Sequence, residues 1–400
     1  MNARRRLGVG VVGFGWLGQA HSRSLLRIPT LFEQRDYDPL LVACADPLPQ
    51  RTEQALGSFG FRRASAEWEA VVADPEVEVV FVAAPNMLHV ELVEAAAAAG
   101  KPVFCEKPVG GRPRDVLRAT LAARAAGVVN GVGYNYRWAP LVQYARELIA
   151  GGELGTITNY RGRFFSMYGA DPRGFNSWRF QLDEGGYGVT SDLLSHAVDM
   201  GLMLLGPIAR VTGTIHTYIT ERPVPGAGGS HYGRGRPGDP TAPVTNEDYA
   251  AMLVEFSSGV RGTFESSRAI VGPESQMAFD AYGTEGALAW NLERINELQL
   301  YRRSADRGSG YTTVLGGDRF PHHGAFVPGA GNPIGFEDLV AIEDHEFCSA
   351  VSAGRPFAPS LEQALAAAEV QDALLRSAVS GRWEDVTALA AAERSPEAVA

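Results

Sequence analysis

The sequence predicts an α/β protein with two domains, a doubly wound parallel sheet followed by an α+β domain. Three observations support this prediction: the length of the chain, an alternation of strand and helix patterns in its first third, and a series of consecutive strand patterns further on. Four hundred residues at 45% hydrophobic composition are more than one compact core usually needs, which favours two domains over one large one.

The first domain is expected over residues 1–133. Short β-branched runs alternate there with longer segments rich in alanine and leucine. The strand candidates are 7–13, 40–46, 77–86, 101–106 and 128–135, and the helix candidates between them are 16–27, 49–60, 89–100 and 113–127. Strands and helices in alternation indicate a parallel sheet that helices cover on both faces.

The pattern changes after Arg137, and a second domain is expected over residues 134–384. Helical signals remain, but strand patterns follow one another at 210–219, 248–259, 260–270, 275–291 and 297–303. Short glycine-containing turns between them predict an antiparallel or mixed sheet. Two stretches rich in glycine and proline, 223–243 and 304–335, are predicted loops, and 385–400 is a predicted flexible tail.

Composition narrows the choice of partner. Thirty-six Lys and Arg against 46 Asp and Glu give a net charge of −10, so a general basic surface for nucleic acid or an anionic membrane is missing. The three cysteines are far apart, in apolar surroundings and without CxxC spacing, which indicates reduced thiols in a cytoplasmic protein. No apolar run is long enough to span a membrane. We therefore expect a small molecule or another protein as the partner.

Three glycines, Gly13, Gly15 and Gly18, have GxGxxG spacing directly after the first strand and at the start of the first helix. In a dinucleotide site the first makes a tight turn, the second lets the pyrophosphate approach the backbone, and the third lets helix and strand pack closely. This context favours a cofactor site over a glycine-rich turn without function. The contacts expected from this loop are Gly13, Phe14, Gly15, Trp16, Leu17 and Gly18.

Asp46 ends the second strand, where an acidic side chain can accept hydrogen bonds from the adenosine ribose of a dinucleotide. A carboxylate there would repel a 2′-phosphate, so NAD is favoured over NADP. Arg51 is near enough in sequence to leave NADP open, and the alternative for Asp46 is an aspartate that only shapes a turn.

Pro85, Asn86 and His89 follow the next strand of the predicted sheet. Because open parallel sheets bind ligands at the carboxyl ends of their strands, we expect these residues to face the nicotinamide half of the cofactor. The alternative is that Asn86 caps the following helix and His89 packs in its first turn.

Glu106 and Lys107 come after the strand "PVFC", at the same edge of the sheet. A lysine that is partly desolvated near a nicotinamide ring is suited to proton transfer, and Glu106 would anchor it or a ribose hydroxyl. The alternative is a surface salt bridge at a strand end, and position alone does not separate the two.

Asp192 and His196 are four residues apart in a helical segment that Ser191 could help to cap. This spacing puts both side chains on one helix face, where the aspartate can orient the histidine as a general base. Taken alone, the pair is more typical of a structural contact.

Polar and aromatic residues are interleaved in two further stretches, which suits a polyhydroxylated ligand. The candidates are Tyr134, Asn135 and Arg137 in "NYRWAP", and Trp178, Arg179 and Gln181 in "FNSWRFQ". Each residue fits an ordinary domain interface equally well. The loop "DRFPHHGAF" adds His322 and His323, for which a solvated loop is the favoured reading and a metal site is not expected.

Together, the GxGxxG turn, Asp46, "PNMLH", "GKPVFCEKP" and "SDLLSHAVD" resemble the glucose-fructose oxidoreductase/inositol dehydrogenase family, Gfo/Idh/MocA, from about Leu7 to Gly381. "FNSWRFQ" and "YGTEGALAWN" resemble its levoglucosan dehydrogenase-like subgroup of sugar and glycoside dehydrogenases. The resemblance implies an N-terminal Rossmann domain, a C-terminal domain with a large open-faced, mostly antiparallel sheet, and homodimers or homotetramers formed largely through that sheet.

The resemblance also implies roles for individual residues. Lys107 would position the reacting hydroxyl, His196 would take its proton, and Asp192 would orient His196 or bind a neighbouring hydroxyl. Trp178, Arg179, Asn135 and Glu106 would join the cofactor contacts, and Tyr134, Arg137, Phe165 and Gln181 would line the substrate site. The expected reaction is NAD-dependent oxidation of a secondary hydroxyl to a ketone. A redox-neutral reaction with retained cofactor and a non-catalytic dinucleotide-binding regulator stay open as alternatives.

Overall fold

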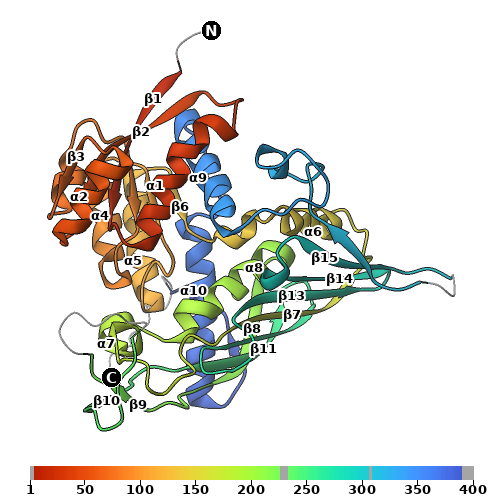
Figure 1. Cartoon of the computed structure of the whole chain (residues 1–400). Coiled ribbons are helices and arrows are strands. Elements are labelled where there is room, and N and C mark those ends of the chain that lie inside the picture. Colours follow the sequence, from red (N-terminus) through yellow and green to blue (C-terminus); the bar gives the residue numbers. More distant parts are fainter. Residues whose placement is uncertain (1–3, 226–232, 306–308, 390–400) are drawn as a thin grey trace. The chain divides into compact units, whose positions relative to one another are not determined.

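The computed structural model describes residues 4–225, 233–305 and 309–389, and the chain divides into two compact units (Figure 1). The first unit comprises Met1–Gly110, Asp115–Ala139 and Gly317–Leu365, and the second comprises Gly111–Arg114, Pro140–Gly316 and Ala366–Ala400. The first unit thus takes in a late segment far beyond residue 133, because helix α9 (Phe336–Ala353) packs against helix α1 (Trp16–Leu31). Residues 390–400 of the expected tail lie outside the described residues.

The first unit is built on a six-stranded sheet in which every pair of neighbours is parallel. Its strands are β1 (Arg5–Val12), β2 (Tyr37–Ala45), β3 (Arg63–Ser65), β4 (Val79–Val82), β5 (Val103–Cys105) and β6 (Asn130–Val132). The order β3-β2-β1-β4-β5-β6 is that of a Rossmann fold, whose ligands bind at the carboxyl ends of the strands. The predicted parallel sheet is confirmed.

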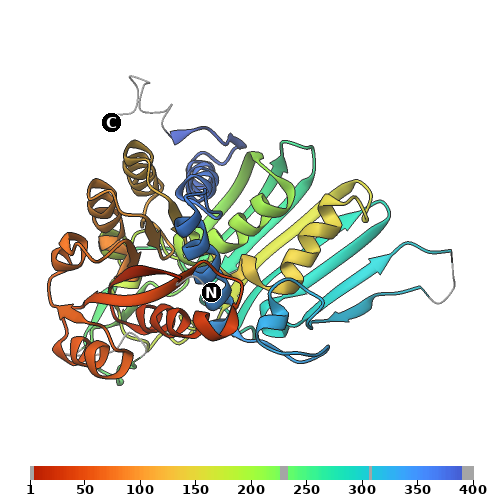
Figure 2. The ribbon, with the colours of Figure 1, turned by 90° about the horizontal axis from the view of Figure 1, so that it is seen from above.

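Helices lie on both sides of this sheet (Figure 2). Besides α1 and α9 they are α2 (Pro49–Gln54), α3 (Glu69–Ala73), α4 (His89–Ala98) and α5 (Pro113–Ala126), with short turns η1 (Ala55–Phe59), η2 (Asn86–Leu88), η3 (Asn135–Trp138) and η7 (His323–Ala325). With both faces covered, strands β4 and β5 are buried throughout, as their continuous apolar sequences predict.

The loop around His322 and His323 is packed, so the expectation of a solvated loop is wrong. His323 is fully buried, and its Nε2 lies 2.8 Å from the carbonyl oxygen of Asn332. The ring of His322 lies edge-on to that of Phe32, with ring centres 6.4 Å apart. His323 is thus removed from bulk water, whereas the His322 side chain remains 25% exposed beside Phe32.

The second unit is built on a nine-stranded sheet in the order β16-β15-β14-β13-β7-β12-β11-β8-β17. Its strands are β7 (Ile157–Ser166), β8 (Ile208–His216), β11 (Tyr249–Phe256), β12 (Arg261–Ser267), β13 (Ser275–Gly283), β14 (Gly286–Asn291), β15 (Glu297–Arg302), β16 (Thr312–Leu315) and β17 (Glu384–Asp385). Neighbours are antiparallel except β7 and β12, which confirms a mostly antiparallel sheet.

Helices α6 (Pro140–Ala150) and α8 (Ser195–Leu205) pack on one face of this sheet, as Figure 2 shows. The remaining elements are η4 (Trp178–Phe180), α7 (Leu182–Gly185), η5 (Thr190–Leu194), η6 (Leu292–Arg294), α10 (Leu361–Ser380) and a small sheet of β9 (Glu221–Pro223) and β10 (Thr241–Pro243).

The other face of the large sheet is open. Along β11, Met252 and Val254 are buried, whereas Leu253 between them is 52% exposed. This alternation is typical of a sheet with one face on the core. In the described parts of the chain, no helix is long and apolar enough to cross a membrane.

Candidate active site

The glycine turn has the geometry of a dinucleotide site. Gly13 has a φ of +89°, and a Cβ there would stand 2.5 Å from the backbone nitrogen of Ala84, so the turn requires glycine. A Cβ at Gly18 would come within 2.0 Å of the carbonyl oxygen of Gly13, because α1 packs closely on the turn. At Gly15 a Cβ would meet only Arg51 Nη1, at 3.9 Å, which leaves room for a ligand.

Helix α1 begins at this turn without a side-chain cap. Its first amide groups are therefore directed toward the space beside Gly15, where a pyrophosphate would bind to them and to the positive end of the helix dipole. The turn and helix fit a dinucleotide.

Asp46 lies directly after β2 and is only 3% exposed. Its carboxylate accepts hydrogen bonds from the backbone amides of Phe14, at 2.8 Å, and Leu48, at 3.0 Å. Arg51 Nη1 lies 3.0 Å from Oδ2. An ionised carboxylate offers about four acceptor positions, so one remains for a ribose hydroxyl. Arg51 offsets part of the negative charge that would repel a 2′-phosphate.

His89 ties two loops of the first unit together. It is buried, with Nδ1 2.8 Å from the carbonyl oxygen of Pro108 and Nε2 2.7 Å from that of Ala84. Burial lowers its pKa. Both ring nitrogens face backbone carbonyl oxygens, so we assign His89 a structural role: it holds together the loops that follow β4 and β5. Asn86 is buried at the start of η2, and α4 begins without a side-chain cap, so the capping alternative for Asn86 is wrong.

Lys107 follows β5, at the sheet edge where Gly13 and Asp46 also lie, and is half-buried. Glu106 is 5% exposed, and its Oε1 lies 3.0 Å from Nε2 of His21. Its Oε2 accepts the backbone N–H of Lys107 at 3.2 Å. A surface salt bridge is therefore the wrong description of Glu106.

Tyr134, Asn135 and Arg137 follow β6 and are all buried. Arg137 Nη1 donates to Oε1 of Gln363 at 2.8 Å, which fastens the start of α10 within the first unit. The ligand contacts expected of these three residues stay predictions.

In the second unit, the segment with Asp192 and His196 is helical, but its first turn, η5, is a π-helix. π-Helical turns are rare and often mark functional sites. The expectation that Ser191 caps the helix is wrong, because its hydroxyl donates to the carbonyl oxygen of Gly111 at 3.0 Å. Asp192 thus lies in an irregular turn, and His196, 4% exposed, lies in the first turn of α8.

Tyr168 and Arg179 help to hold Asp192. The hydroxyl of Tyr168 donates to its Oδ2 at 2.9 Å, and Arg179 Nη1 lies 3.8 Å from the same oxygen. Desolvation raises the pKa of Tyr168 to about 12, and the charge of Asp192 adds to the shift. Tyr168 therefore remains a hydrogen-bond donor at neutral pH. The sequence reasoning missed Tyr168; the available signal was its place two residues beyond the end of the central strand β7.

Aromatic side chains flank His196 and Arg179. The ring of Phe164 lies 5.7 Å from that of His196, and the Arg179 guanidinium lies over the Trp178 ring at 4.5 Å. Phe165, the predicted contact, points to the opposite face of β7 from Phe164, because successive strand residues alternate.

Gln181 has its own partners. Its amide donates to Oδ1 of Asn176 and to the carbonyl oxygen of Pro243, both at 2.8 Å. The structure thus brings Trp178 and Arg179 to Asp192, whereas Gln181 ties the loop to β10.

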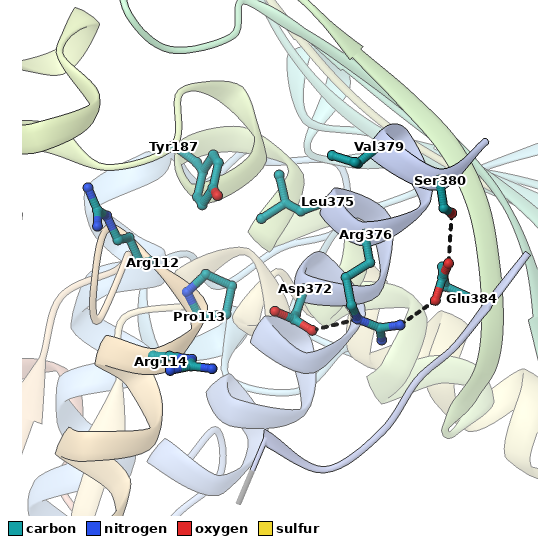
Figure 3. Close-up of a pocket in the computed structure, with 10 residues that line it drawn as sticks. All are labelled: Arg112, Pro113, Arg114, Tyr187, Asp372, Leu375, Arg376, Val379, Ser380 and Glu384. Atoms are coloured by element: carbon teal, nitrogen blue, oxygen red, sulfur yellow. Dashed lines mark hydrogen bonds and ion pairs between the residues drawn. The ribbon is translucent and has the colours of Figure 1, made fainter. Parts of the chain in front are cut away.

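A surface cavity of about 590 Å³ in the second unit contains none of these residues (Figure 3). Several of its charged groups are paired. The Arg376 guanidinium lies 3.0 Å from a carboxylate oxygen of Asp372 and 2.5 Å from one of Glu384. The Glu384 carboxylate also accepts a hydrogen bond from the Ser380 hydroxyl at 2.7 Å. It offers neither a nucleotide turn nor the candidate proton-transfer groups.

Comparison with known proteins places these features in a family. Residues 7–134 match the oxidoreductase family with an NAD-binding Rossmann fold, and residues 142–289 match the GFO/IDH/MocA C-terminal domain. A levoglucosan dehydrogenase of Pseudarthrobacter phenanthrenivorans is 33% identical over 97% of this chain and 100% of the relative. The chain belongs to the Gfo/Idh/MocA family. It is an NAD-binding oxidoreductase.

Other Gfo/Idh/MocA proteins support the same placement. An inositol 2-dehydrogenase of Rhizobium meliloti is 26% identical over 93% of this chain and 97% of the relative. A solved levoglucosan dehydrogenase in complex with NADH and levoglucosan matches with a TM-score of 0.88 at 32% identity, over 96% of this chain and all of that one. The predicted resemblance is confirmed.

Proposed function

We propose that this Gfo/Idh/MocA protein is an NAD-dependent dehydrogenase that oxidises a secondary hydroxyl of a sugar, anhydrosugar, inositol or glycoside to a ketone. The setting of Asp192 carries the proposal. A carboxylate held by a neutral tyrosine and an arginine, one turn before a buried histidine, is suited to bind and deprotonate a hydroxyl-rich substrate.

The roles follow from chemistry. NAD, when bound, accepts the hydride from the carbon that carries the reacting hydroxyl. His196 takes the hydroxyl proton, and Asp192 orients His196 or binds a neighbouring hydroxyl. Lys107 positions the reacting oxygen and favours negative charge on it as the proton leaves. The turn at Gly13 to Gly18 and Asp46 hold the pyrophosphate and the ribose.

A substrate panel tests this proposal. Purified protein is mixed with NAD or NADP and with levoglucosan, inositols, free hexoses or alkyl glucosides, and absorbance of the reduced cofactor is followed. We expect turnover with at least one compound and a preference for NAD, because the Asp46 carboxylate would repel a 2′-phosphate.

Other outcomes of this panel would revive the alternatives. Product formation without net NADH, with cofactor retained through gel filtration, would indicate a redox-neutral reaction. NAD binding without conversion of any compound would indicate a regulator and contradict the proposal. Equal use of NADP would show that Arg51 outweighs Asp46.

We also propose that the chain forms a homodimer or homotetramer through the open face of the nine-stranded sheet. An exposed leucine on that face, Leu253 of β11, supports this. Light scattering should give a mass of two or four chains, and Leu253→Glu should lower it, with exposed Leu121→Glu on α5 as the control. A wild-type monomer at micromolar concentration would contradict the proposal.

A further inference from the structure

A buried group of ionisable side chains lies behind the turn that carries Lys107, entirely within the first unit. It consists of His21 on α1, Glu106 after β5 and Asp344 on α9, which are 1%, 5% and 0% exposed. These three residues are called the triad below. The proposed chemistry makes no use of His21 or Asp344, and buried charges are costly unless they are paired.

The triad forms one continuous chain of hydrogen bonds. His21 Nδ1 lies 2.8 Å from Oδ1 of Asp344, and His21 Nε2 lies 3.0 Å from Oε1 of Glu106. The other oxygen of Glu106 accepts the backbone N–H of Lys107 at 3.2 Å. The chain therefore runs from α9 through α1 to the peptide group of Lys107.

Aromatic packing fixes the imidazole at the centre of this chain. The His21 ring lies 5.4 Å from the Phe81 ring and 5.3 Å from the Phe104 ring. Ring rotation would break two hydrogen bonds and disturb both aromatic contacts, so one orientation is held.

The hydrogen bonds determine how many protons the triad holds. Two bonds among three groups need two protons, whereas a neutral imidazole carries only one N–H. The triad therefore carries one additional proton, and its net charge is −1. Burial alone lowers the pKa of His21, but Asp344 and Glu106 outweigh it and raise the pKa well above its usual value. Burial also raises the pKa of Asp344.

Burial favours the neutral forms of the acidic groups that lie closest to the triad. Burial raises the pKa of Glu343 well above its usual value, and the negative charges of Glu106 and Asp344 add to this effect. Burial likewise raises the pKa of the Cys105 and Cys348 thiols. Both ring nitrogens of His21 already face carboxylate oxygens, and within the described residues no group of three or more His, Cys, Asp and Glu side chains could hold a metal ion.

We propose that His21, Glu106 and Asp344 are positioning residues for Lys107. This proposal rests on the function proposed above. The triad fixes the peptide group at the start of the lysine turn and thereby aims the Lys107 side chain. The cofactor phosphates would bind at the N-terminus of helix α1, and the same helix carries His21 about 7.5 Å further along its axis. Helix α1 would thus position both the cofactor phosphates and the turn that carries Lys107.

Isosteric variants test this proposal by steady-state kinetics. Glu106→Gln keeps the shape of the side chain but not its charge, and we expect kcat to fall by about 10- to 100-fold because small misplacements of catalytic groups cost this much. The KM for NAD should change little, since the two oxygens of Glu106 face His21 and the Lys107 amide rather than the glycine turn, and Asp46 is unaffected. Glu346→Gln, on the same helix as Asp344, is the control and should behave as wild type.

The pH dependence separates positioning from mere packing. In Asp344→Asn, His21 has lost one carboxylate, so its pKa falls and the additional proton leaves as pH rises. Above that pH a single imidazole N–H remains for two acceptors, and the hold on Glu106 weakens. We expect kcat of this variant to fall with rising pH over about pH 6 to 9, on a limb that wild type lacks.

Nuclear magnetic resonance tests the proton count in the wild-type protein itself, and a folded His21→Gln variant serves only to assign the signals. With ¹⁵N-labelled histidine, and the His21 signals assigned by their loss in His21→Gln, the ring signals should not titrate over about pH 6 to 8. Titration near the ordinary histidine pKa would overturn the proposal. Wild-type kcat and pH profile in folded Glu106→Gln and Asp344→Asn would also overturn it. Lys107→Ala distinguishes a failure of the proposed function from a failure of the positioning role. If Lys107→Ala loses activity while the triad variants keep theirs, only the positioning role is contradicted.

Discussion

Lys107→Ala is expected to reduce turnover by on the order of 10³-fold or more, with NAD binding still measurable. The reason is that alanine removes the charged group that positions the reacting oxygen, whereas the glycine turn and Asp46 are untouched. Rates of NADH formation with the substrate found in the panel, and NAD titration by fluorescence, measure the two effects separately.

The composition of the chain provides a sharp control for this experiment. The protein has two lysines, Lys101 and Lys107, among 36 Lys and Arg residues. Lys101 Nζ donates to the carbonyl oxygen of Asp74 at 2.7 Å, away from the lysine turn, so Lys101→Ala should keep nearly full activity. Lys107→Arg is also informative, because it keeps the charge but changes the shape and reach of the donor. Wild-type turnover in Lys107→Ala would show that the assigned chemistry is wrong.

His196→Asn is expected to lower kcat by about 10²- to 10⁴-fold, the range usual for loss of a general base. Asparagine can still hydrogen-bond to a hydroxyl, but it cannot accept the proton. The deficit should shrink as pH rises, because hydroxide in solution can then remove the proton. A kcat profile of both proteins against pH measures this.

The matched control for His196→Asn is the exposed His216 on β8. His216→Asn should leave both kcat and its pH dependence unchanged. If His196→Asn loses activity equally at every pH, the histidine binds or packs rather than transferring a proton. Wild-type kcat in the variant would remove His196 from the mechanism.

Local patterns predicted the first sheet well. The glycine turn could be identified from sequence alone, because the roles of Gly13, Gly15 and Gly18 depend on the absence of a side chain and not on contacts with distant residues. The buried strands of the sheet were equally clear from their continuous apolar runs.

Contacts between distant segments could not be predicted in this way. Glu106 was placed at a strand end, but its partner His21 lies 85 residues earlier and Asp344 lies 238 residues later. His21 did leave one signal: it follows Gly18 by three residues, so it shares the buried face of α1. Tyr168 and the π-helical turn before His196 depend on tertiary packing, which no local pattern reports.

The return of residues 317–365 to the first unit bears on how this protein can be divided and recombined. A fragment that ends at residue 133 contains every glycine of the cofactor turn, but it lacks α9. Such a fragment would leave His21 without Asp344, and the rings of Phe81 and Phe104 without Phe347. The nucleotide-binding half is therefore not a contiguous module, and a chimera between relatives must exchange both segments together.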